Sequence, residues 1–331
     1  MFGIHGQHFH QQMSKKLWLL ILINCNFILA NQNFGVVVHG GAGVLSNLSK
    51  EQQLVIEQKV SETILSAYEI LQKGGSSLDA VEFVVSEFED SLLFNAGRGS
   101  VYTSDETQEM DASIMYGFDR SAGAVASIKK IKNPIKLARK VLEETEHVIL
   151  VGDGAESFAE SIGETIVEPS YFHSEKNLKR LRKLKSKIAD SQIIQDKIGT
   201  VGAVAIDKKG NISAATSTGG MTNKMPGRVG DTPIIGSGTW AQNQVCGVSS
   251  TGHGEFFIKF QVAKEVCTRM EYLNQSLKDS SHAVIKELKD IGASGGLIAI
   301  DKDANVSTPF NTEGMIRGSL TNVSDLNVSI Y

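Results

Sequence analysis

Apolar residues recur along the chain with two spacings, which separate the expected strands from the expected helices. Phe34 to His39 is a β-branched run that ends in a glycine cluster, as a strand before a turn does. Residues 51–73 carry apolar side chains at nearly helical spacing and end at Gly74-Gly75, a helix C-terminal signal. A second helix is expected to begin with Ser77 as its cap, and Asn133-Pro134 opens another.

Strands in the second half of the chain are expected in hairpin pairs. Residues 201–207 and 212–217 flank Lys208-Lys209-Gly210-Asn211, and the same pattern recurs at 296–302 with 305–307. Grouped hairpins and grouped helices favour an α+β fold of two antiparallel sheets covered by helices over an alternating βαβ fold, in one domain. The other expected elements are strands at 111–116, 123–131 and 147–151, the last of them buried, and helices at 135–144, 254–272 and 282–291.

Residues 173–199 differ in kind from the rest of the chain, because basic side chains crowd the stretch and few apolar ones follow Phe172. Such a charge run predicts a solvated, mobile connector. A nucleic-acid-binding arm is disfavoured, because no aromatic residues are interleaved. The whole chain also lacks a basic excess: 33 Lys and Arg stand against 37 Asp and Glu, a formal net charge of -4. A small molecule or a protein is therefore the expected partner, and nucleic acid is not.

The N-terminus has the pattern of an export signal. Met13-Ser14-Lys15-Lys16 precedes the apolar run Leu17 to Ile23, and Ala30 supplies a small residue for cleavage. The run is too short and too interrupted for a stable membrane span. Residues 1–30 are thus expected to comprise upstream residues and a signal peptide, and the protein to be periplasmic or secreted. Either Met1 or Met13 could be the true start.

Two cysteines, Cys246 and Cys267, remain once Cys25 leaves with the signal. They show neither a CxxC motif nor metal-ligand spacing. They could pair in an oxidising compartment, yet each stands in an apolar context where a buried free thiol is common. The sequence leaves both states open.

Glycine is the compositional excess, at 32 of 331 residues, and there is no collagen period. Gly40-Gly41-Ala42-Gly43 follows a strand, but neither a phosphate-binding loop nor a dinucleotide pattern completes it. A turn that brings backbone close to a pocket is the better interpretation.

The most informative glycine precedes a threonine, in Ile198-Gly199-Thr200-Val201-Gly202, directly after the basic segment. Taken alone, Thr200 reads as a plain strand residue. Other motifs follow in order, however, and they change that interpretation. They are Phe94-Asn95-Ala96-Gly97, Met110-Asp111-Ala112-Ser113, Thr216-Ser217-Thr218-Gly219-Gly220, Gly227-Arg228-Val229-Gly230-Asp231, Ser250-Thr251-Gly252-His253-Gly254-Glu255 and Asn311-Thr312-Glu313-Gly314.

Together these motifs resemble the plant-type asparaginase and isoaspartyl peptidase family of N-terminal-nucleophile hydrolases. The resemblance implies a four-layer αββα sandwich and a precursor that cuts itself between Gly199 and Thr200. Residues 31–199 would then form an α subunit, with 173–199 as its mobile tail, and residues 200–331 a β subunit. It also implies a homodimer of αβ units and an enzyme that cleaves isoaspartyl dipeptides and L-asparagine, releasing L-aspartate.

The chemistry of Thr200 agrees with this resemblance. A hydroxyl is a weak nucleophile that needs a base, and an α-amine freed on the same residue supplies one with a pKa of about 8. Attack on an amide would give an acyl-enzyme that water hydrolyses. Gly199 offers little bulk and tolerates unusual backbone angles, which suits self-cleavage.

The resemblance also carries roles to other positions. Thr218 matches the threonine that hydrogen-bonds the nucleophile, and Thr251 and Gly252 match the oxyanion hole. Arg228 and Asp231 match the residues that hold the substrate's α-carboxylate and α-ammonium, and their charges suit those groups. The remaining matches are Gly254 as a backbone contact and Asn95 as a residue near the nucleophile.

Several other groups are expected to be bystanders. His253 occupies a variable position of its motif, and neither it nor His39 has an organised serine for a catalytic triad. Asp111 is expected to satisfy buried backbone groups. No cofactor is required, although the loop around Asn95 resembles a family sodium loop with backbone carbonyl ligands; residues 89–93 depart from its commonest form.

Two alternatives stay open at this point. One is a glycosylasparaginase, which usually has Asp where Gly199 stands. The other is an exported binding protein that keeps the fold without the activity.

Overall fold

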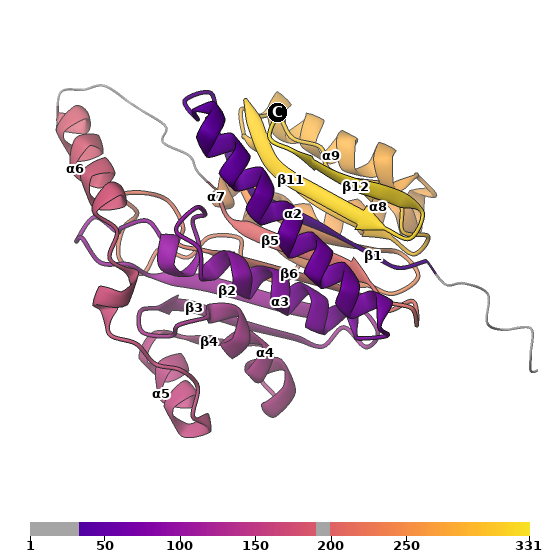
Figure 1. Ribbon diagram of the computed structural model, residues 1–331, viewed down its shortest axis with the longest axis horizontal. Coiled ribbons are helices and arrows are strands. Elements are labelled where there is room, and N and C mark those ends of the chain that lie inside the picture. Colours follow the sequence, from indigo (N-terminus) through magenta and orange to yellow (C-terminus); the bar gives the residue numbers. More distant parts are fainter. Residues whose placement is uncertain (1–32, 190–198) are drawn as a thin grey trace, which may run out of the picture. The chain divides into compact units, whose positions relative to one another are not determined.

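A computed structural model describes residues 33–189 and 199–331, and the side chains of 187–189 lie outside the description. Residues 1–30, where the signal peptide is expected, are outside the described part of the chain. Asn33–Tyr331 forms one compact unit (Figure 1). None of its described helices is long and apolar enough to span a membrane.

The larger sheet has eight strands in the order β12-β11-β1-β5-β6-β2-β3-β4. Its neighbours pair antiparallel except β3 and β4, which run parallel, so the expectation of purely antiparallel sheets is wrong at this edge. Strands β1, β5 and β6 lie in the middle of the sheet and are buried along their whole length. The strands are β1 Gly35–Gly43, β2 Met110–Tyr116, β3 Ala122–Ile128, β4 Ile149–Val151, β5 Val201–Ile206, β6 Ile212–Thr218, β11 Gly314–Thr321 and β12 Ser324–Ser329.

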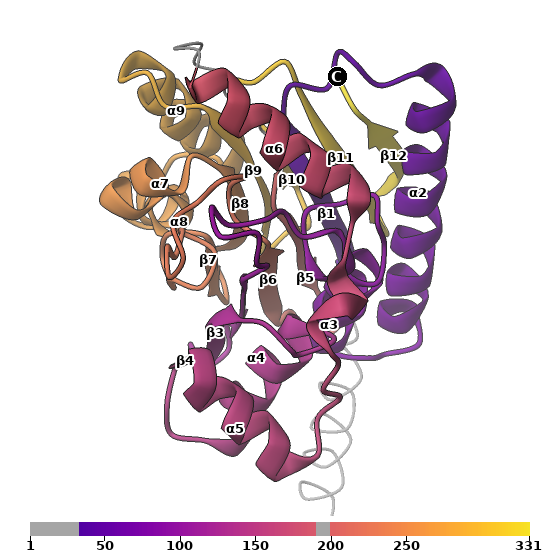
Figure 2. The ribbon, with the colours of Figure 1, turned by 90° about the vertical axis from the view of Figure 1, so that its left-hand side faces the viewer.

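The smaller sheet has four antiparallel strands in the order β10-β9-β8-β7, and one group of helices covers the outer face of each sheet. Figure 2 shows the layers in sequence: α8 and α9, the smaller sheet, the larger sheet, then α2 and α3. The expected αββα sandwich is thereby confirmed. The remaining elements are β7 Thr239–Gln242, β8 Cys246–Gly252, β9 Gly295–Asp301, β10 Val306–Ser307, α2 Lys50–Gln72, α3 Ser77–Glu89, α4 Pro134–Glu144, α5 Gly152–Ile162, α6 Glu175–Ala189, α7 Gly254–Phe260, α8 Val262–Leu273 and α9 Leu277–Asp290, with short 3₁₀ turns at Gly97–Gly99 and Pro169–Phe172.

Capping side chains define where the covering helices begin. The Ser49 hydroxyl accepts from Gln52 N at the start of α2, and Gln52 Oε1 accepts from Ser49 N in turn. A second capping box opens α3, where Ser76 rather than the expected Ser77 is the cap and Asp79 is its partner. Each box satisfies backbone N–H groups that a helix start would otherwise leave without partners.

Two expected elements take a different form. The strand expected to be buried at 147–151 is only β4, whose Ile149 and Val151 are exposed, because it is the last strand of the sheet. The single helix expected over 254–272 is divided into α7 and α8 at Gln261, which has a φ of 48°. Left-handed backbone at a non-glycine residue interrupts helical hydrogen bonding, so the chain changes direction there.

The basic segment is also more ordered than its charges predict, because residues 175–189 form helix α6. Leu181 is fully buried beneath the helix. Arg182 makes a paired ion contact with Glu106, and Asn177 Nδ2 donates to the Gly99 carbonyl at 2.9 Å. The expected irregular connector is therefore a helix up to Ala189, and it is attached to the loop that follows Asn95.

The two expected hairpins are present and use the same turn chemistry. Asp207 Oδ1 accepts from the backbone N–H groups of Lys209 and Asn211 between β5 and β6. Asp301 Oδ1 accepts in the same way from Asp303 and Asn305 between β9 and β10. An aspartate that binds the N–H groups two and four residues onward stabilises a tight turn.

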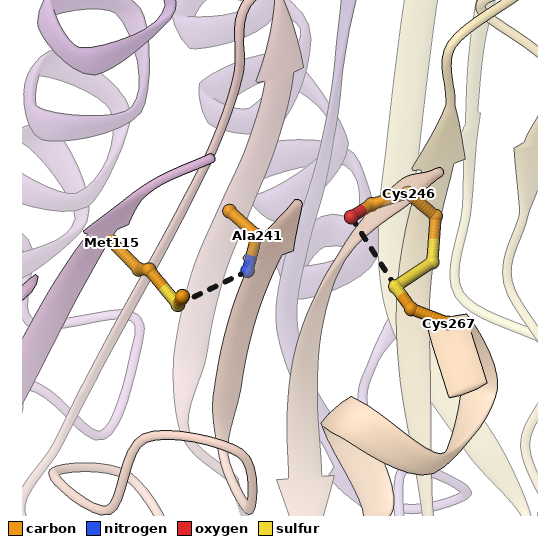
Figure 3. Close-up of a disulfide and its surroundings, with 4 residues drawn as sticks. All are labelled: Met115, Ala241, Cys246 and Cys267. Carbon is orange, nitrogen blue, oxygen red and sulfur yellow. Dashed lines mark hydrogen bonds between the residues drawn. A yellow bond between two sulfur atoms is a disulfide. The ribbon is translucent and has the colours of Figure 1, made fainter. Parts of the chain in front are cut away.

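A disulfide joins Cys246 on β8 to Cys267 on α8, with 5.6 Å between the two Cα atoms (Figure 3). Both cysteines are buried. Of the two states that the sequence left open, the structure has the paired one. The bond ties the strand that ends at Thr251 and Gly252 to the helix that covers it.

Candidate active site

Thr200 lies just before β5, beyond the last backbone pairs that hold this strand. The pairing of β5 with β6 begins at Val201↔Ser217, and the pairing of β5 with β1 ends at His39↔Gly202. Thr200 is nevertheless buried, with 7% of its surface exposed. Side chains rather than the sheet ladder must therefore fix the position of this residue.

The end of β6 places a second threonine beside it. Thr200 Oγ1 donates to Thr218 Oγ1 at 3.2 Å, and Thr218 Oγ1 also accepts from Gly220 N at 3.0 Å. The antiparallel hairpin explains the contact, because its two open ends lie side by side. The expected hydrogen bond between the candidate nucleophile and Thr218 is thus present.

The peptide carbonyl of Gly199 packs against the glycine cluster that ends β1. Gly41 has a φ of +106°, and a Cβ there would lie 2.7 Å from the Gly199 carbonyl carbon. A Cβ on Gly199 would in turn lie 2.5 Å from Thr251 Oγ1. Only glycine fits at these two positions, so the expected close backbone approach is confirmed. The expected turn is wrong, because Gly41 to Gly43 continue β1 after a register shift that follows His39.

Thr251 stands near the end of β8, and its Oγ1 accepts from Ala42 N at 3.2 Å. Its hydroxyl is also close to Gly199, 2.5 Å from the place that a Cβ on that residue would take. Thr251 itself is fully buried, and Gly252 after it lines the cavity beside Thr200. A Cβ on Gly252 would press on Phe257 and on the Gly295 backbone, so the strand end is closely packed.

One cavity brings the candidate nucleophile and the candidate substrate-binding residues together. Its walls come from β1, β6, β8 and the loop between β6 and β7. The residues that line it are Ala42, Gly199, Thr200, Thr218, Gly220, Met221, Thr222, Arg228, Gly230, Asp231 and Gly252.

Arg228 is held by a carboxylate that sequence analysis did not identify. Its Nε and Nη2 atoms both donate to Glu255, each at 2.9 Å. Glu255 lies in the first turn of α7. A bidentate pair of this kind fixes the plane of the guanidinium group. The ion pair between Arg228 and Asp231 that the bare charges suggest is thus replaced by one between Arg228 and Glu255.

Asp231 is buried, and its Oδ2 atom has no hydrogen-bond partner. Burial raises the pKa of this carboxyl to about 7, against an opposing effect of Arg228. A buried carboxylate without a partner is costly, so the site favours a cationic group that would pair with Asp231. An α-ammonium group has that charge.

Gly254 supplies backbone beside both charged residues. A Cβ there would lie 2.9 Å from Arg228 Nη2 and 2.9 Å from Asp231 Oδ1. The absence of a side chain keeps the space between the two charges open. Gly254 is not among the residues that line the cavity, and its expected contact with the substrate stays a prediction.

Asn95 supports the turn that follows Thr218. Its Nδ2 donates to the Gly220 carbonyl at 2.7 Å, and its Oδ1 accepts from Val101 N at 3.0 Å. Gly219 N donates to the Asn95 carbonyl. Asn95 therefore lies near the nucleophile, as expected, and it anchors the turn on which Thr218 depends.

Two further polar residues hold the loop that carries Arg228. Glu109 Oε2 accepts from Gly227 N at 2.7 Å, and the buried Lys224 donates to the Glu109 carbonyl at 2.7 Å. Asp111, next on β2, accepts from Ser127 N at 2.8 Å, in agreement with its expected structural role. Lys224 lies three residues before the motif that carries Arg228, and no local pattern connects it to Glu109.

The described residues contain no cluster of three or more histidine, cysteine or acidic side chains that could hold a metal ion. A Cβ on Gly99 would collide with the Phe94 carbonyl oxygen and lie 3.1 Å from that of Ser91. These two carbonyl oxygens therefore lie close to Gly99.

Comparison with known proteins identifies relatives over most of the chain. The family model described as asparaginase matches residues 32–330. The isoaspartyl peptidase of Salmonella typhimurium is 45% identical over 294 residues, which cover 85% of this chain and 93% of that protein. The isoaspartyl peptidase of Escherichia coli is 44% identical, with 85% and 91% covered. A putative isoaspartyl peptidase/L-asparaginase of Dictyostelium discoideum is 43% identical, with 91% and 99% covered.

Proposed function

Since the chain belongs to the asparaginase family, we propose that it is an amidohydrolase that releases L-aspartate from isoaspartyl dipeptides and L-asparagine. The observation that carries the proposal is the shared cavity, in which a buried threonine hydroxyl stands opposite a cation and an anion. Arg228 would bind the α-carboxylate and Asp231 the α-ammonium of an aspartyl group. These two contacts would present the side-chain carbonyl carbon to Thr200.

The proposed reaction begins with self-cleavage between Gly199 and Thr200. Thr200 Oγ1 attacks the Gly199 carbonyl carbon, and the C–N bond breaks to leave an ester on Oγ1 and a free α-amine on Thr200. Water then hydrolyses the ester to the Gly199 carboxylate and the Thr200 hydroxyl. In turnover the α-amine takes the hydroxyl proton as Oγ1 attacks the substrate amide. Thr251 and the Gly252 backbone stabilise the developing oxyanion. The amine or ammonia of the substrate amide then leaves, and water releases L-aspartate from the acyl-enzyme.

A gel and an assay test this proposal together. Purified protein should give two fragments on a denaturing gel, the smaller beginning at Thr200-Val201-Gly202, and should hydrolyse an isoaspartyl dipeptide. Thr200→Ala should abolish cleavage and turnover because it removes the nucleophile, while Thr308→Ala, which changes a threonine outside the cavity, should leave both intact. An intact wild-type chain without activity, or unchanged turnover in Thr200→Ala, would refute the proposal.

The preferred substrate is decided by direct competition. An isoaspartyl dipeptide, L-asparagine and a glycosylated asparagine each carry the aspartyl α-groups, so Arg228 and Asp231 cannot separate them. The relatives named isoaspartyl peptidase favour the dipeptide as the preferred substrate. Higher kcat/KM for the dipeptide than for glycosylated asparagine is the expected result, and the reverse order would assign the protein to glycosylasparaginase activity.

A sodium ion held by the loop after α3 is a further part of the proposal. The proposal rests on the resemblance of this loop to the family's sodium loop, and the carbonyl oxygens of Ser91 and Phe94 both lie close to Gly99, where a hard cation could use them as ligands. Such an ion would rigidify the loop that places Asn95 under Thr218. Melting temperature should then rise with sodium chloride more than with choline chloride at equal ionic strength, and equal curves would exclude the ion.

Export and dimerisation complete the proposed biology. The buried disulfide supports export, because such bonds form and persist in oxidising compartments. Expression with residues 1–30 should deliver the protein outside the cytoplasm, and cytoplasmic retention of the full chain would oppose export. Light scattering should report a mass of two αβ units, and the mass of one unit would oppose the dimer.

A further inference from the structure

His39 is a buried histidine that the proposed reaction does not use. It lies on β1, has no exposed surface, and its ring lies between the two sheets. Its Nδ1 atom is 3.0 Å from the Thr200 carbonyl oxygen, and its Nε2 atom is 3.0 Å from Ser249 Oγ on β8. A Cβ on Gly202 would lie 2.5 Å from Nε2, so glycine at that position makes room for the ring.

A chain of buried hydroxyls continues from the ring to the other side of the site. Ser249 Oγ contacts Thr216 Oγ1 at 2.7 Å, and Thr216 contacts Thr239 Oγ1 at 2.6 Å. Ser113 Oγ lies 2.7 Å from Thr239 Oγ1 and donates to the Thr232 carbonyl at 2.6 Å. The chain thus joins the carbonyl of the candidate nucleophile to the residue next to Asp231.

Both ends of this chain are carbonyl oxygens, which can only accept. A neutral His39 ring carries one proton, so it can donate either to the Thr200 carbonyl or to Ser249 Oγ, but not to both. Burial lowers the pKa of His39 to about 3, so the ring is neutral at neutral pH. The Thr200 carbonyl requires a proton on Nδ1, and Nε2 then accepts from Ser249.

With a neutral ring, the hydrogen-bonded chain has one contact more than the number of N–H and O–H protons that could fill these contacts. With the proton on Nδ1, the shortage falls at Ser113, whose single hydroxyl proton faces both Thr239 Oγ1 and the Thr232 carbonyl. It then lies at the far end of the chain from Thr200. In this tautomer His39 Nδ1 donates to the Thr200 carbonyl.

We propose that His39 is a positioning residue that fixes the peptide plane of Thr200 through this bond. The inference rests on the proposed function. Thr200 lies beyond the ladder on both sides, and cleavage would make it a chain terminus, where strands fray unless they are anchored. Thr218 anchors its hydroxyl and His39 its carbonyl, and these two contacts together orient Oγ1 and the α-amine.

Two substitutions of His39 separate positioning from packing. An asparagine amide nitrogen reaches the place of Nδ1 and keeps the donor to Thr200, whereas a glutamine amide reaches the place of Nε2 and loses it. Positioning therefore predicts that His39→Gln lowers kcat by about 100-fold, as a misplacement of about 1 Å does, while His39→Asn stays within about 10-fold of wild type. KM should change little, because Arg228 and Asp231 bind the substrate.

A purely structural role predicts the opposite order, because glutamine is closer to histidine in volume than asparagine is. Activity is normalised to the cleaved fraction on a gel, and Ser281→Ala, which removes a buried hydroxyl elsewhere, is the control for lost polar packing. Gly202→Ala gives a second approach if a His39 variant does not fold. Its Cβ displaces the ring, and kcat should fall with KM retained.

The outcomes are distinguishable from those of the proposed function. Wild-type protein without turnover of the dipeptide refutes the function. Active wild-type protein refutes the inference alone if His39→Gln keeps its kcat, if asparagine is worse than glutamine, or if Gly202→Ala folds with unchanged kcat. A larger kcat loss for glutamine than for asparagine, at constant KM, supports it.

Discussion

On one side of the candidate site Thr200, Thr218 and Thr251 present neutral hydroxyls from the ends of strands, whereas on the other Arg228 and Asp231 present charges from a loop. Sheet register fixes two of the hydroxyls, since Thr218 pairs with Asp111 and Thr251 with Gly296. The Thr200 hydroxyl is held by its hydrogen bond to Thr218. The charges are fixed by ion pairing and by loop hydrogen bonds. Register places atoms to within fractions of an ångström, which bond formation requires, while a charge acts over a longer range.

This difference predicts that mutations on the two sides affect different kinetic constants. Hydroxyls on the strand ends should determine kcat, because they act on charge that develops during the reaction. Charges on the loop should determine KM, because they bind groups that do not react. Each of the following experiments tests whether the hydroxyls determine kcat and the charges determine KM, or whether one side affects both constants.

The largest expected effect is on the hydroxyl side. Thr251→Val keeps the shape of the side chain and removes the hydroxyl, so kcat should fall by about 100- to 1000-fold, as the loss of one oxyanion donor does. KM measured with an isoaspartyl dipeptide should stay within about twofold. A large rise in KM with kcat retained would assign Thr251 to substrate binding, and the distinction between the two sides would then be wrong.

Arg228→Lys tests the charged side with the net charge kept. Lysine cannot reproduce a planar bidentate contact, and hydrogen bonds to charged groups contribute about 1.5–3 kcal/mol, so KM should rise about 10- to 100-fold. The kcat at saturating dipeptide should change much less. Equal losses in kcat and kcat/KM would show that the guanidinium acts in the transition state.

Asp231→Asn tests the same side through pH. The pKa of Asp231 is raised to about 7 by burial, so the folded protein keeps this proton while the unfolded chain has lost it. That contribution to stability is present at low pH and is lost as pH rises through about 7. The variant should therefore melt about 2 °C or more above wild type at pH 8, while its KM rises.

The pH profile supplies the matching kinetic readout for Asp231. Only the ionised carboxylate pairs with an α-ammonium group, so kcat/KM of the wild type should increase as pH rises through about 7. Asp231→Asn should lack this increase. A variant profile that still follows the wild type would assign the titration to another group, such as the freed α-amine.

The smallest kinetic effect is expected from the disulfide, which joins β8 to α8 and lines no part of the cavity. Replacing Cys246 and Cys267 by alanine should cost about 3 kcal/mol and lower the melting temperature by about 5 to 10 °C. Because neither cysteine touches the cavity, kcat and KM should stay at wild-type values below the melting transition. A change in either constant would show that β8 transmits its packing to Thr251.

Local patterns were enough to predict the hairpins and two sheets covered by helices. The roles of Thr200, Thr218 and Thr251, and the contact between the first two, came from the resemblance to the family, because each of these residues alone reads as a plain strand residue. His39 was taken for a bystander, because its contact with Thr200 depends on β1 pairing with β5 across 161 positions. No local spacing reports such a register.

Glu255 and α6 were missed for different reasons. The Arg228 partner lies 27 residues away on α7, and its role depends on how the loop folds back. Helix α6 did leave a signal, because Leu178 and Leu181 stand at helical spacing, but the density of basic residues suggested a solvated segment instead. Burial of Leu181 and the Glu106 contact stabilise the helix despite its like charges.

The strand order of the larger sheet determines in which order folding and self-cleavage would have to occur. Residues on the two sides of the proposed cut alternate within it: β1 lies between β11 and β5, and β6 lies between β5 and β2. A cut at Gly199 would therefore convert one chain into two interlocked chains held by backbone ladders. Refolding after denaturation would become a bimolecular reaction, with a melting temperature that depends on concentration. The protein would need to fold before it is cut.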